Sequence, residues 1–424
     1  MKKTLYAAIT IFLFIGGGIC LKKWYDYRHV QPHLSVVGFI KMADGLGRQS
    51  VELISALKDD ICISFIPSRK SNLKDIPKDT REIVAQKYRR QGKVLFFEDC
   101  LWLPGGAFYK KLSSPKKEDQ IRISYSMFES TKIPSEWVVI LNTYFDAVAV
   151  PDKFLIDIYK NCGVTIPIFT LPLGLNIDPL LKMPLKRSRG HPMTFANFSV
   201  CDDRKNQLTL VRAFVKAFGK NNQNVRLLIN CRRSDDKKIA EAIRREIEEE
   251  GLYNVIFSEL CLEKDAYLKL FQTVDCYVSL SKGEGFSIQP REAMALGIPV
   301  IATSNTAQKT ICESNLVRSV ASNIRVPASY PWTNATYGHS FDCEIEDAAQ
   351  ALLDVFEHYD LYLQKAEQSR NWAGQYDYKN LKPFYKTLIN PQEVILGEKN
   401  QITENALFTD SKELYEKYLK LRAN

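Results

Sequence analysis

One stretch of the sequence constrains the fold more than any other, because it predicts a strand, a glycine loop, a helix and a second strand in that order. The apolar run Asp275–Leu280 predicts a buried strand, and the loop Lys282–Gln289 follows it. Pro290 suits the first position of a helix, and Gly297 suits its C-terminal cap. The second strand is expected at Ile298–Thr303. This is an α/β crossover, whose loop and helix N-terminus together form an anion site.

Two carboxylates lie eight positions apart in this stretch. Glu284 is expected in the loop, at the carboxyl end of the first strand, and Glu292 in the first turn of the helix. Both are then expected to face one crevice, where they accept hydrogen bonds from sugar hydroxyls beside a bound phosphate. A structural role for Glu292 stays open, because an acidic residue in the first turn complements the helix dipole. Gly283 and Gly285 are expected to provide backbone geometries closed to other residues.

The segment from Glu284 to Thr303 resembles the Glu-x7-Glu segment of the retaining glycosyltransferases of family four, the glycosyl transferases group 1. The resemblance extends roughly from Leu34 to Tyr385. It implies the α/β fold called GT-B, in which two Rossmann-like doubly wound domains face each other across a cleft. It also implies a UDP- or GDP-linked sugar donor and an acceptor hydroxyl on a glycan, a lipid or another cell-envelope molecule. No further cofactor is expected.

The length of 424 residues exceeds what one hydrophobic core supports, which predicts two domains. Strands and helices alternate along the chain, and this alternation predicts parallel sheets. Further strands are expected at 34–40, 61–66, 94–97, 121–126, 146–150 and 166–170, with helices at about 81–91 and 151–161. The predicted organisation is a membrane anchor or signal segment in 1–23, an N-terminal Rossmann-like acceptor domain in 34–178, a linker in 179–192, a C-terminal Rossmann-like nucleotide-sugar-binding domain in 193–376, and a return helix with an amphipathic tail in 377–424.

The first apolar run, Leu5–Leu21, has lysines on both sides. A membrane anchor is the favoured interpretation, with a cleaved signal peptide and a buried element as the alternatives. The basic counts on the two flanks are nearly balanced, so they set the orientation poorly. Ten cysteines lie far apart without a Cys-x2-Cys pair, which argues against a zinc site and favours a reducing compartment. Because nucleotide sugars are made in the cytosol, we expect a membrane-associated enzyme whose catalytic domains face the cytoplasm.

The chain carries a net charge of +9, but its basic residues are scattered without a long Lys/Arg stripe. Nucleic acid is therefore not an expected partner, whereas anionic lipid and phosphate-bearing substrates are. Near the C-terminus, Lys412–Leu421 is amphipathic, which predicts either a docking helix or a membrane-surface contact.

Transfer of a sugar requires electrostatic stabilisation of the diphosphate leaving group. The resembled family places a lysine against this diphosphate, and Lys205 matches it. The arginine that usually lies five or six residues before this lysine is absent, since Ser199 and Val200 stand there. Arg204 is the candidate substitute. A solvated basic pair is the alternative interpretation of Arg204 and Lys205.

The other candidate donor residues come from the loop of the motif and from the first turn of the N-terminal domain. That first turn is expected between a strand and a helix, and a simple tight turn is the alternative interpretation. The candidates are Glu284 and the amides around Phe286 and Ser287 for the donor sugar, Glu292 for the ribose hydroxyls, and the backbone of Gly45 and Gly47 for the diphosphate, with Gly283 and Gly285 shaping the loop.

Glu129 is a candidate for the acceptor side of the cleft. It follows a predicted strand in Tyr125–Ser130, which closely resembles a segment found in a subset of the family. A helix-capping or solvated carboxylate is the alternative. Many family members carry a cleft histidine in this domain, yet no histidine occurs between Leu34 and Gly190.

The prediction is therefore a retaining, metal-independent glycosyltransferase of the hexosyltransferase type, in which Glu284, Lys205 and Arg204 carry the chemistry. In retaining members the leaving phosphate is often considered the base, so the missing histidine does not exclude activity. No Asp-x-Asp signature indicates a metal, and no Ser-His-Asp spacing or zinc motif supports a hydrolase. A catalytically weak relative that binds a nucleotide sugar or glycan, and a sugar-nucleotide epimerase on the same fold, are the alternatives.

Overall fold

The computed structural model describes Gly18 and residues 21–389, apart from 43, 75, 102–119, 233–236 and 331–333. Most of the predicted anchor Leu5–Leu21 and the whole amphipathic segment Lys412–Leu421 lie outside the described residues. Within the described part, no helix combines the length and the apolar character needed to cross a membrane.

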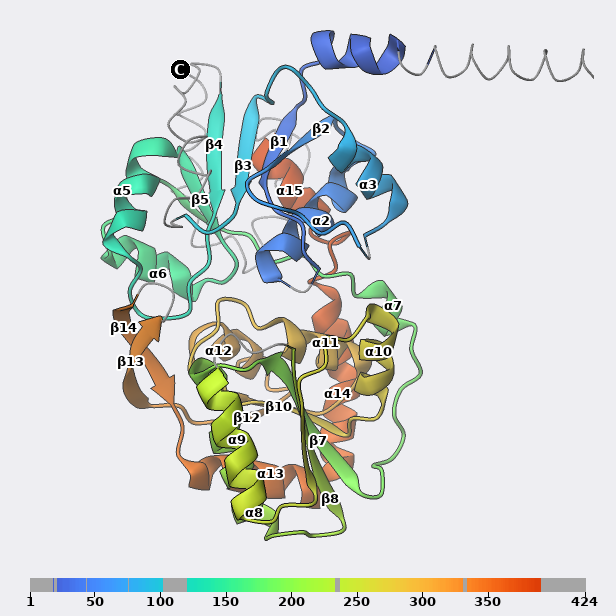
Figure 1. The fold of residues 1–424 in the computed structure, drawn as a ribbon, viewed down its shortest axis with the longest axis vertical. Coiled ribbons are helices and arrows are strands. Elements are labelled where there is room, and N and C mark those ends of the chain that lie inside the picture. The colour runs from blue at the N-terminus through green and yellow to red at the C-terminus, as the bar shows by residue number, and fades with distance from the viewer. Residues whose placement is uncertain are drawn as a thin grey trace, which may run out of the picture.

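Two six-stranded parallel sheets form the framework, one in each half of the chain (Figure 1). Every pairing within them is parallel. The first sheet has the order β2 (Ile63–Pro67), β1 (Leu34–Gly38), β3 (Val94–Glu98), β4 (Ile121–Tyr125), β5 (Ala147–Val150), β6 (Ile168–Thr170). The second has the order β12 (Arg318–Val320), β11 (Val300–Thr303), β10 (Cys276–Ser279), β7 (Met193–Val200), β8 (Val225–Arg232), β9 (Val255–Ser258).

Each sheet has one point at which the strand order reverses. In the second sheet this point lies between β7 and β10, so its order is that of the dinucleotide-binding Rossmann fold. In the first sheet it lies between β1 and β3, which is the flavodoxin-like order. Ligands of open α/β sheets bind outside the carboxyl ends of the strands at such points. The topology therefore marks the loops after β1, β7 and β10 as candidate site loops.

Helices cover both sheets, as connections between parallel strands require. The helices of the first half are α2 (Gly45–Leu57), α3 (Lys78–Ala85), α5 (Ser135–Tyr144), α6 (Phe154–Asn161) and α7 (Asp178–Leu181). Those of the second half are the 3-10 helix η1 (Asp203–Lys205), α8 (Gln207–Phe218), α9 (Lys237–Glu249), α10 (Lys264–Gln272), α11 (Ile288–Leu296), α12 (Thr306–Cys312), α13 (Ile345–Glu357), α14 (Tyr359–Gly374) and α15 (Lys382–Ile389). A further helical segment spans residues 21–29.

The strands are apolar along their whole length because both faces of each sheet are covered. All five residues of β3 are buried. Val94 and Phe96 join the hydrophobic core that includes α2, whereas Leu95 and Phe97 join the core on the opposite face that includes α5. Such continuous apolar runs are typical of parallel strands buried on two sides.

The last described helix, α15, returns to the first domain. Leu381, Phe384 and Tyr385 belong to the same hydrophobic core as β1 and α2. The crossing is fixed by a bridge between Leu175 and Asp377. The chain therefore passes between the domains twice, once through α7 and once between α14 and α15.

An antiparallel hairpin that the sequence did not predict connects the two domains on another side. It consists of β13 (Ile324–Tyr330) and β14 (Ala335–Asp342) and extends from the second domain to the first (Figure 1). The Ser130 hydroxyl donates to the carbonyl of Tyr337 at 2.7 Å, and the amide of His339 donates to the Thr131 hydroxyl at 2.9 Å. The hairpin therefore pins the segment after β4.

Several predicted boundaries shift by a few residues. The helix expected at about 81–91 is α3, which ends at Ala85, and the expected linker 179–192 includes most of α7. The prediction that Pro290 begins a helix was wrong, because α11 starts at Ile288. Ser287 adopts a left-handed backbone with φ of 67° and starts the helix earlier. Glu292 consequently lies in the second turn of α11 rather than in the first.

Candidate active site

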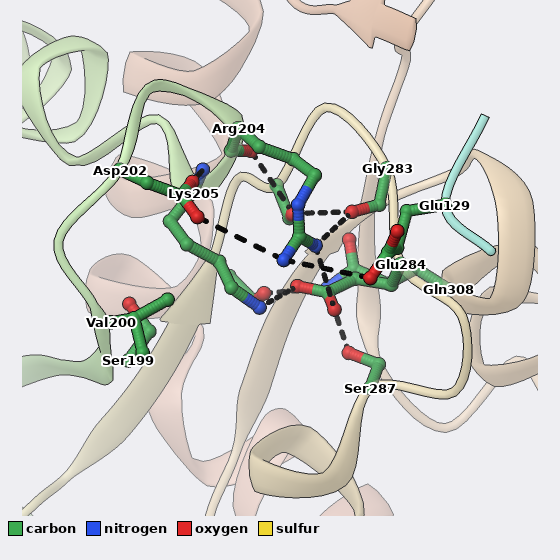
Figure 2. Close-up of polar contacts among 12 residues, drawn as sticks. Glu129, Ser199, Val200, Asp202, Arg204, Lys205, Gly283, Glu284, Ser287 and Gln308 are labelled. Carbon is green, nitrogen blue, oxygen red and sulfur yellow. Dashed lines mark hydrogen bonds and ion pairs between the residues drawn. The ribbon is translucent and has the colours of Figure 1, made fainter. Parts of the chain in front are cut away.

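The candidate site lies where the loops after β7 and β10 meet the first domain (Figure 2). These two strands flank the reversal point of the second sheet, so topology alone brings their carboxyl ends together. The loop after β7 contains η1, and the loop after β10 contains Glu284. Gly283 carries the carbonyl that connects them, since it accepts a hydrogen bond from Arg204 Nη1 at 2.6 Å.

Glu284 is the centre of the charged cluster. Its Oε1 lies 2.5 Å from Lys205 Nζ, and its Oε2 lies 3.3 Å from Arg204 Nη1. Only 7% of Glu284 is exposed. Burial by itself would raise the pKa of the carboxyl, but Lys205 and Arg204 together lower this pKa below its ordinary value. Glu284 is therefore ionised at neutral pH.

Arg204 brings a residue of the first domain into the same cluster. Its Nη2 lies 3.9 Å from Glu129 Oε1 and 3.9 Å from Asp202 Oδ2. Burial would lower the pKa of Arg204, but Glu129, Asp202 and Glu284 raise it above its ordinary value. Burial also raises the pKa of Glu129, and Arg204 offsets part of that rise. The predicted residues Glu129, Arg204, Lys205 and Glu284 thus lie together.

Ser199 and Val200, which stand where the resembled family has an arginine, take no part in this cluster (Figure 2). The Ser199 hydroxyl donates to Asn197 Oδ1 and accepts from Gln207 Nε2, both at 2.7 Å. Arg204 supplies a guanidinium to the cluster from a different position, at the end of the loop rather than at the end of the strand.

The glycines of the motif loop are needed for space, which corrects their predicted role. Neither Gly283 nor Gly285 has the positive φ that only glycine adopts easily. A Cβ on Gly283 would lie 2.1 Å from the carbonyl oxygen of Glu129, and one on Gly285 would lie 2.2 Å from Met127 Cγ. Both contacts cross between the domains, so these glycines let the motif loop touch the first domain.

Beyond the loop, Phe286 and Ser287 are held from behind. The Phe286 side chain is buried, and its ring lies 5.4 Å from that of Tyr376. The guanidinium of Arg291 lies 3.9 Å from the centre of the Phe286 ring and donates to the carbonyls of Phe286 and Ser287. Gln308 Nε2 donates to the Ser287 hydroxyl at 3.1 Å. The start of α11 is therefore fixed before any ligand binds.

Glu292 has a different environment from Glu284. Its Oε1 accepts from Arg48 Nη1 of the first domain at 2.6 Å, and its Oε2 accepts from the Tyr267 hydroxyl at 2.9 Å. The interpretation of Glu292 as a first-turn complement to the helix dipole was wrong, because α11 has no acidic residue in its first turn. Glu292 instead connects α11 to α2 across the domain boundary.

Gly45 and Gly47 lie in the first turn of α2 rather than in a free turn before it. Asp44 caps this helix, and its Oδ1 accepts from the amides of Leu46 at 3.1 Å and Gly47 at 3.4 Å. Two of the amides suggested for the diphosphate are thereby occupied. A Cβ on Gly45 would lie 3.6 Å from Ile288 Cδ1, so this turn faces the N-terminus of α11.

Two functional candidates were missed from the sequence, namely Arg48 and Tyr267. Arg48 directly follows the glycine turn, and its position there was the available signal. Tyr267 lies in α10, a helix that the sequence analysis did not predict, so no local signal pointed to it. Among the described residues, no group of three or more His, Cys, Asp or Glu side chains is placed to hold a metal ion.

Comparison with known sequences identifies the second domain. Residues 193–326 match the family Glycosyl transferases group 1. The chain is also 21% identical over 268 residues to Uncharacterized protein 356 of Sulfolobus islandicus rod-shaped virus 1, an alignment that covers 60% of this chain and 72% of that protein.

Comparison with solved structures identifies the fold. The chain is similar to Anabaena Alr3699/HepE in complex with UDP and glucose, with a TM-score of 0.60 and 12% identity over 84% of this chain and 99% of that one. A glycosyltransferase from Rickettsia africae ESF-5 gives 0.61 and 14% over 84% and 98%. S. aureus TarM in complex with fondaparinux, alpha-GlcNAc-glycerol and UDP gives 0.53 and 16% over 70% and 55%. The predicted GT-B architecture of two facing parallel sheets is thus confirmed.

Proposed function

We propose that this protein is a retaining, metal-independent glycosyltransferase that moves a sugar from a nucleotide-sugar donor to an acceptor hydroxyl. The observation that carries the proposal is the buried cluster in which Glu284 pairs with Lys205 and Arg204. This cluster lies at the reversal point of a Rossmann-type sheet, inside the segment that matches the glycosyltransferase family. It also faces the first domain, through which an acceptor would approach.

In this proposal Lys205 and Arg204 stabilise the diphosphate as it leaves. Charge develops on the leaving group in the transition state, and cations fixed beforehand in a partly dry site stabilise it without reorganisation. Lys205 and Arg204 have side chains that are only 11% and 23% exposed. Their positive charge takes the place that a divalent cation would otherwise fill beside the diphosphate.

The N-terminus of α11 is the second element that would bind phosphate. A helix N-terminus presents free amides and a partial positive charge. Since Asp44 already caps α2, the α11 terminus is the more open of the two termini that face each other. Arg291 orients it by holding the carbonyls of Phe286 and Ser287, so the amides that follow are directed forward.

The two motif glutamates would hold the two sugars of the donor. Glu284 accepts hydrogen bonds from hydroxyls of the transferred sugar, next to the cations that take the diphosphate. Glu292 accepts hydrogen bonds from the ribose. Each oxygen of Glu292 accepts one protein hydrogen bond, and a carboxylate oxygen has room for a second.

The acceptor side is assigned to Glu129 and the segment after β4. No histidine lies between Leu34 and Gly190, so the proton of the acceptor hydroxyl passes to the leaving phosphate, as in the resembled retaining enzymes. Glu129 then serves as a cleft carboxyl that contacts the acceptor. Its raised pKa, caused by burial, suits a group that exchanges hydrogen bonds with hydroxyls.

The similar structures support the substrate classes. Anabaena Alr3699/HepE has been crystallised with UDP-glucose, and S. aureus TarM with UDP and alpha-GlcNAc-glycerol. We accordingly propose a UDP- or GDP-linked hexose as the donor and a glycan or lipid-linked hydroxyl as the acceptor. The apolar run Leu5–Leu21 supports a membrane-associated enzyme with its catalytic domains on the cytoplasmic face.

The test is a screen of nucleotide sugars by thermal shift, followed by donor turnover with and without candidate acceptors. A bound donor raises the melting temperature by mass action. The anomeric configuration of the product, read by NMR, decides the stereochemistry, and an inverted product would overturn the retaining assignment. Binding without turnover would instead support a catalytically weak relative, and a changed donor sugar without transfer would support an epimerase.

Removal of metal ions should leave the activity unchanged, because the cluster supplies the positive charge from its own side chains. The measurement is the initial transfer rate in excess chelator, compared with the rate after addition of magnesium or manganese. A rate that falls in chelator and returns with either ion would contradict the metal-independent assignment.

A further inference from the structure

A solvent-exposed aromatic segment lies at the far end of the first domain. Helix 21–29 projects from this end, opposite the second domain (Figure 1). Trp24 is 53% exposed, Tyr25 is 58% exposed and Tyr27 is 42% exposed. Large aromatic side chains usually bury most of their area, so three in one exposed turn of helix require an explanation.

The loop 86–93 forms a continuous surface with this helix. The amide of Arg89 donates to the carbonyl of Tyr27 at 2.8 Å. The loop itself is attached to the body of the domain, since the amide of Gly92 donates to the Ser35 hydroxyl at 2.8 Å, and Cys62 Sγ lies 3.3 Å from the Tyr88 hydroxyl. We name helix 21–29 together with loop 86–93 the helix–loop surface.

The helix–loop surface is strongly basic as well as aromatic. It carries seven Lys or Arg residues against a single carboxylate, Asp26. All seven are exposed, and they are Lys22, Lys23, Arg28, Lys87, Arg89, Arg90 and Lys93. The guanidinium of Arg28 lies 4.6 Å from the centre of the Trp24 ring, so cation and aromatic ring share one patch. Elsewhere the basic residues are interspersed with acids, as the ion pairs of α8 and α9 show.

Aromatic rings and cations together match the interface of an anionic bilayer. Trp and Tyr favour the headgroup level, where an amphipathic ring meets both lipid and water. Lys and Arg are attracted to anionic headgroups. The sequence immediately before the surface is the apolar run Leu5–Leu21, which begins next to Trp24. Charge, ring type and neighbouring sequence thus indicate the same partner.

We propose that the helix–loop surface docks on an anionic lipid bilayer and orients the first domain against it. The helix lies at the end of the first domain opposite the second domain, so the docked protein keeps the charged cluster between the domains open to solvent (Figure 1). This surface is separate from the candidate active site and does not depend on the proposed reaction. A nucleic acid would be the competing partner for such cations, and the test includes it.

The test uses the full-length protein reconstituted in vesicles of phosphatidylcholine, alone or mixed with phosphatidylglycerol. The readout is quenching of Trp24 fluorescence by brominated lipid, taken as the difference between the protein and Trp24→Phe. We expect stronger quenching in the anionic vesicles, and weaker quenching at high salt because salt screens the charges. Reconstitution places every variant on the bilayer, so the quenching reports docking of the surface and not recruitment.

The decisive variant reverses three loop charges, Arg89→Glu, Arg90→Glu and Lys93→Glu. Each basic residue near an anionic surface contributes about fivefold to the docking equilibrium, so the triple change should weaken docking by more than about a hundredfold. The matched control reverses three exposed charges of α9, namely Lys237, Lys238 and Arg245, and should leave Trp24 quenching unchanged.

Three results would overturn the proposal. They are equal Trp24 quenching in neutral and anionic vesicles, unchanged quenching in the loop variant, and release of the surface from anionic vesicles by added RNA. Donor turnover in detergent is measured in parallel and should be the same for the loop variant and the wild type. A failure of docking is thereby distinguishable from a failure of the proposed enzymatic function.

Discussion

Each domain buries a carboxyl group at the point where its strand order reverses, and the two groups have opposite ionisation. Glu98 ends β3 beside the reversal of the first sheet, and Glu284 follows β10 beside the reversal of the second. Glu98 is fully buried, and neither of its oxygens accepts a hydrogen bond from a described residue. Burial raises the pKa of Glu98 to about 8, whereas cations hold the pKa of Glu284 below its ordinary value.

The difference teaches that burial alone does not decide the charge of a carboxyl group in this protein. The cations decide it. In the first domain Ser50 offsets only part of the rise in the pKa of Glu98, so the group stays protonated at neutral pH. In the second domain Lys205 and Arg204 keep Glu284 charged. Only the second reversal point is therefore arranged for a charged ligand, in agreement with its match to the glycosyltransferase family.

The largest expected effect comes from removing the charge that the second domain holds. Glu284→Ala should lower the transfer rate by at least about a hundredfold, because a preorganised polar group at the reacting sugar is lost. It should also lower the free energy of unfolding by about 3 kcal/mol, because two partly buried cations lose their partner. The measurements are the maximal rate with saturating donor and urea unfolding.

Glu284→Gln separates these two effects. The amide preserves shape and hydrogen bonding but not charge, so its loss of activity isolates the electrostatic contribution. Full activity in a folded Glu284→Ala protein would disprove the assignment of Glu284 to the reaction.

A smaller effect is expected when either cation is removed. Lys205→Ala and Arg204→Ala should each raise the donor KM about tenfold, since one charge-assisted contact to phosphate is lost. Arg204→Lys is the informative companion, because lysine keeps the charge but lacks the forked guanidinium that reaches Gly283 and Glu284 together. Equal kinetics for wild type and the double alanine variant would show that the pair is a structural feature only.

The parts of this site that sequence could predict depend on local order along the chain. Residues after adjacent strands of a parallel sheet meet at one edge, so Lys205 and Glu284 were predictable as neighbours once the strands were located. Gly297 was predictable as a helix cap, and it does adopt a left-handed backbone with φ of 70°. Both inferences need only the identity of each element.

The parts that sequence could not predict depend on contacts between the domains. The Arg48–Glu292 ion pair joins residues 244 positions apart. The close approach of Gly283 to Glu129 and the contact of the β13–β14 hairpin with Thr131 likewise arise only when the domains meet. No pattern along the chain encodes these distances, because they depend on how two independently folded surfaces pack.

Glu292 tests whether a carboxylate shared between the domains behaves like Glu284. Glu292→Gln should raise the donor KM by up to about tenfold and change the maximal rate by less than about twofold, because ribose binding is lost equally in ground and transition states. Arg48→Ala should have a weaker effect of the same kind, since the Tyr267 hydroxyl still binds Glu292. A fall in maximal rate as large as that of Glu284→Ala would assign Glu292 to the chemical step.

Glu98→Gln should have the smallest effect on transfer and a distinct effect on stability. The folded protein keeps the Glu98 proton up to a pKa of about 8, whereas the unfolded chain releases it near the ordinary value of 4.5. The stability from this group is therefore fully present below the unfolded pKa and is lost as pH rises toward the folded pKa. Each pH unit in that window costs the wild type about 1.4 kcal/mol that Glu98→Gln does not lose.

Urea unfolding at about pH 5.5, 6.5 and 7.5 measures this difference. The free energy of unfolding of Glu98→Gln should gain on that of the wild type with each step, and the two curves should become parallel above about pH 8. Parallel curves throughout the range would mean that Glu98 is already ionised in the folded protein. In that case an unseen cation must neutralise it, and the first reversal point would resemble the second in its electrostatics.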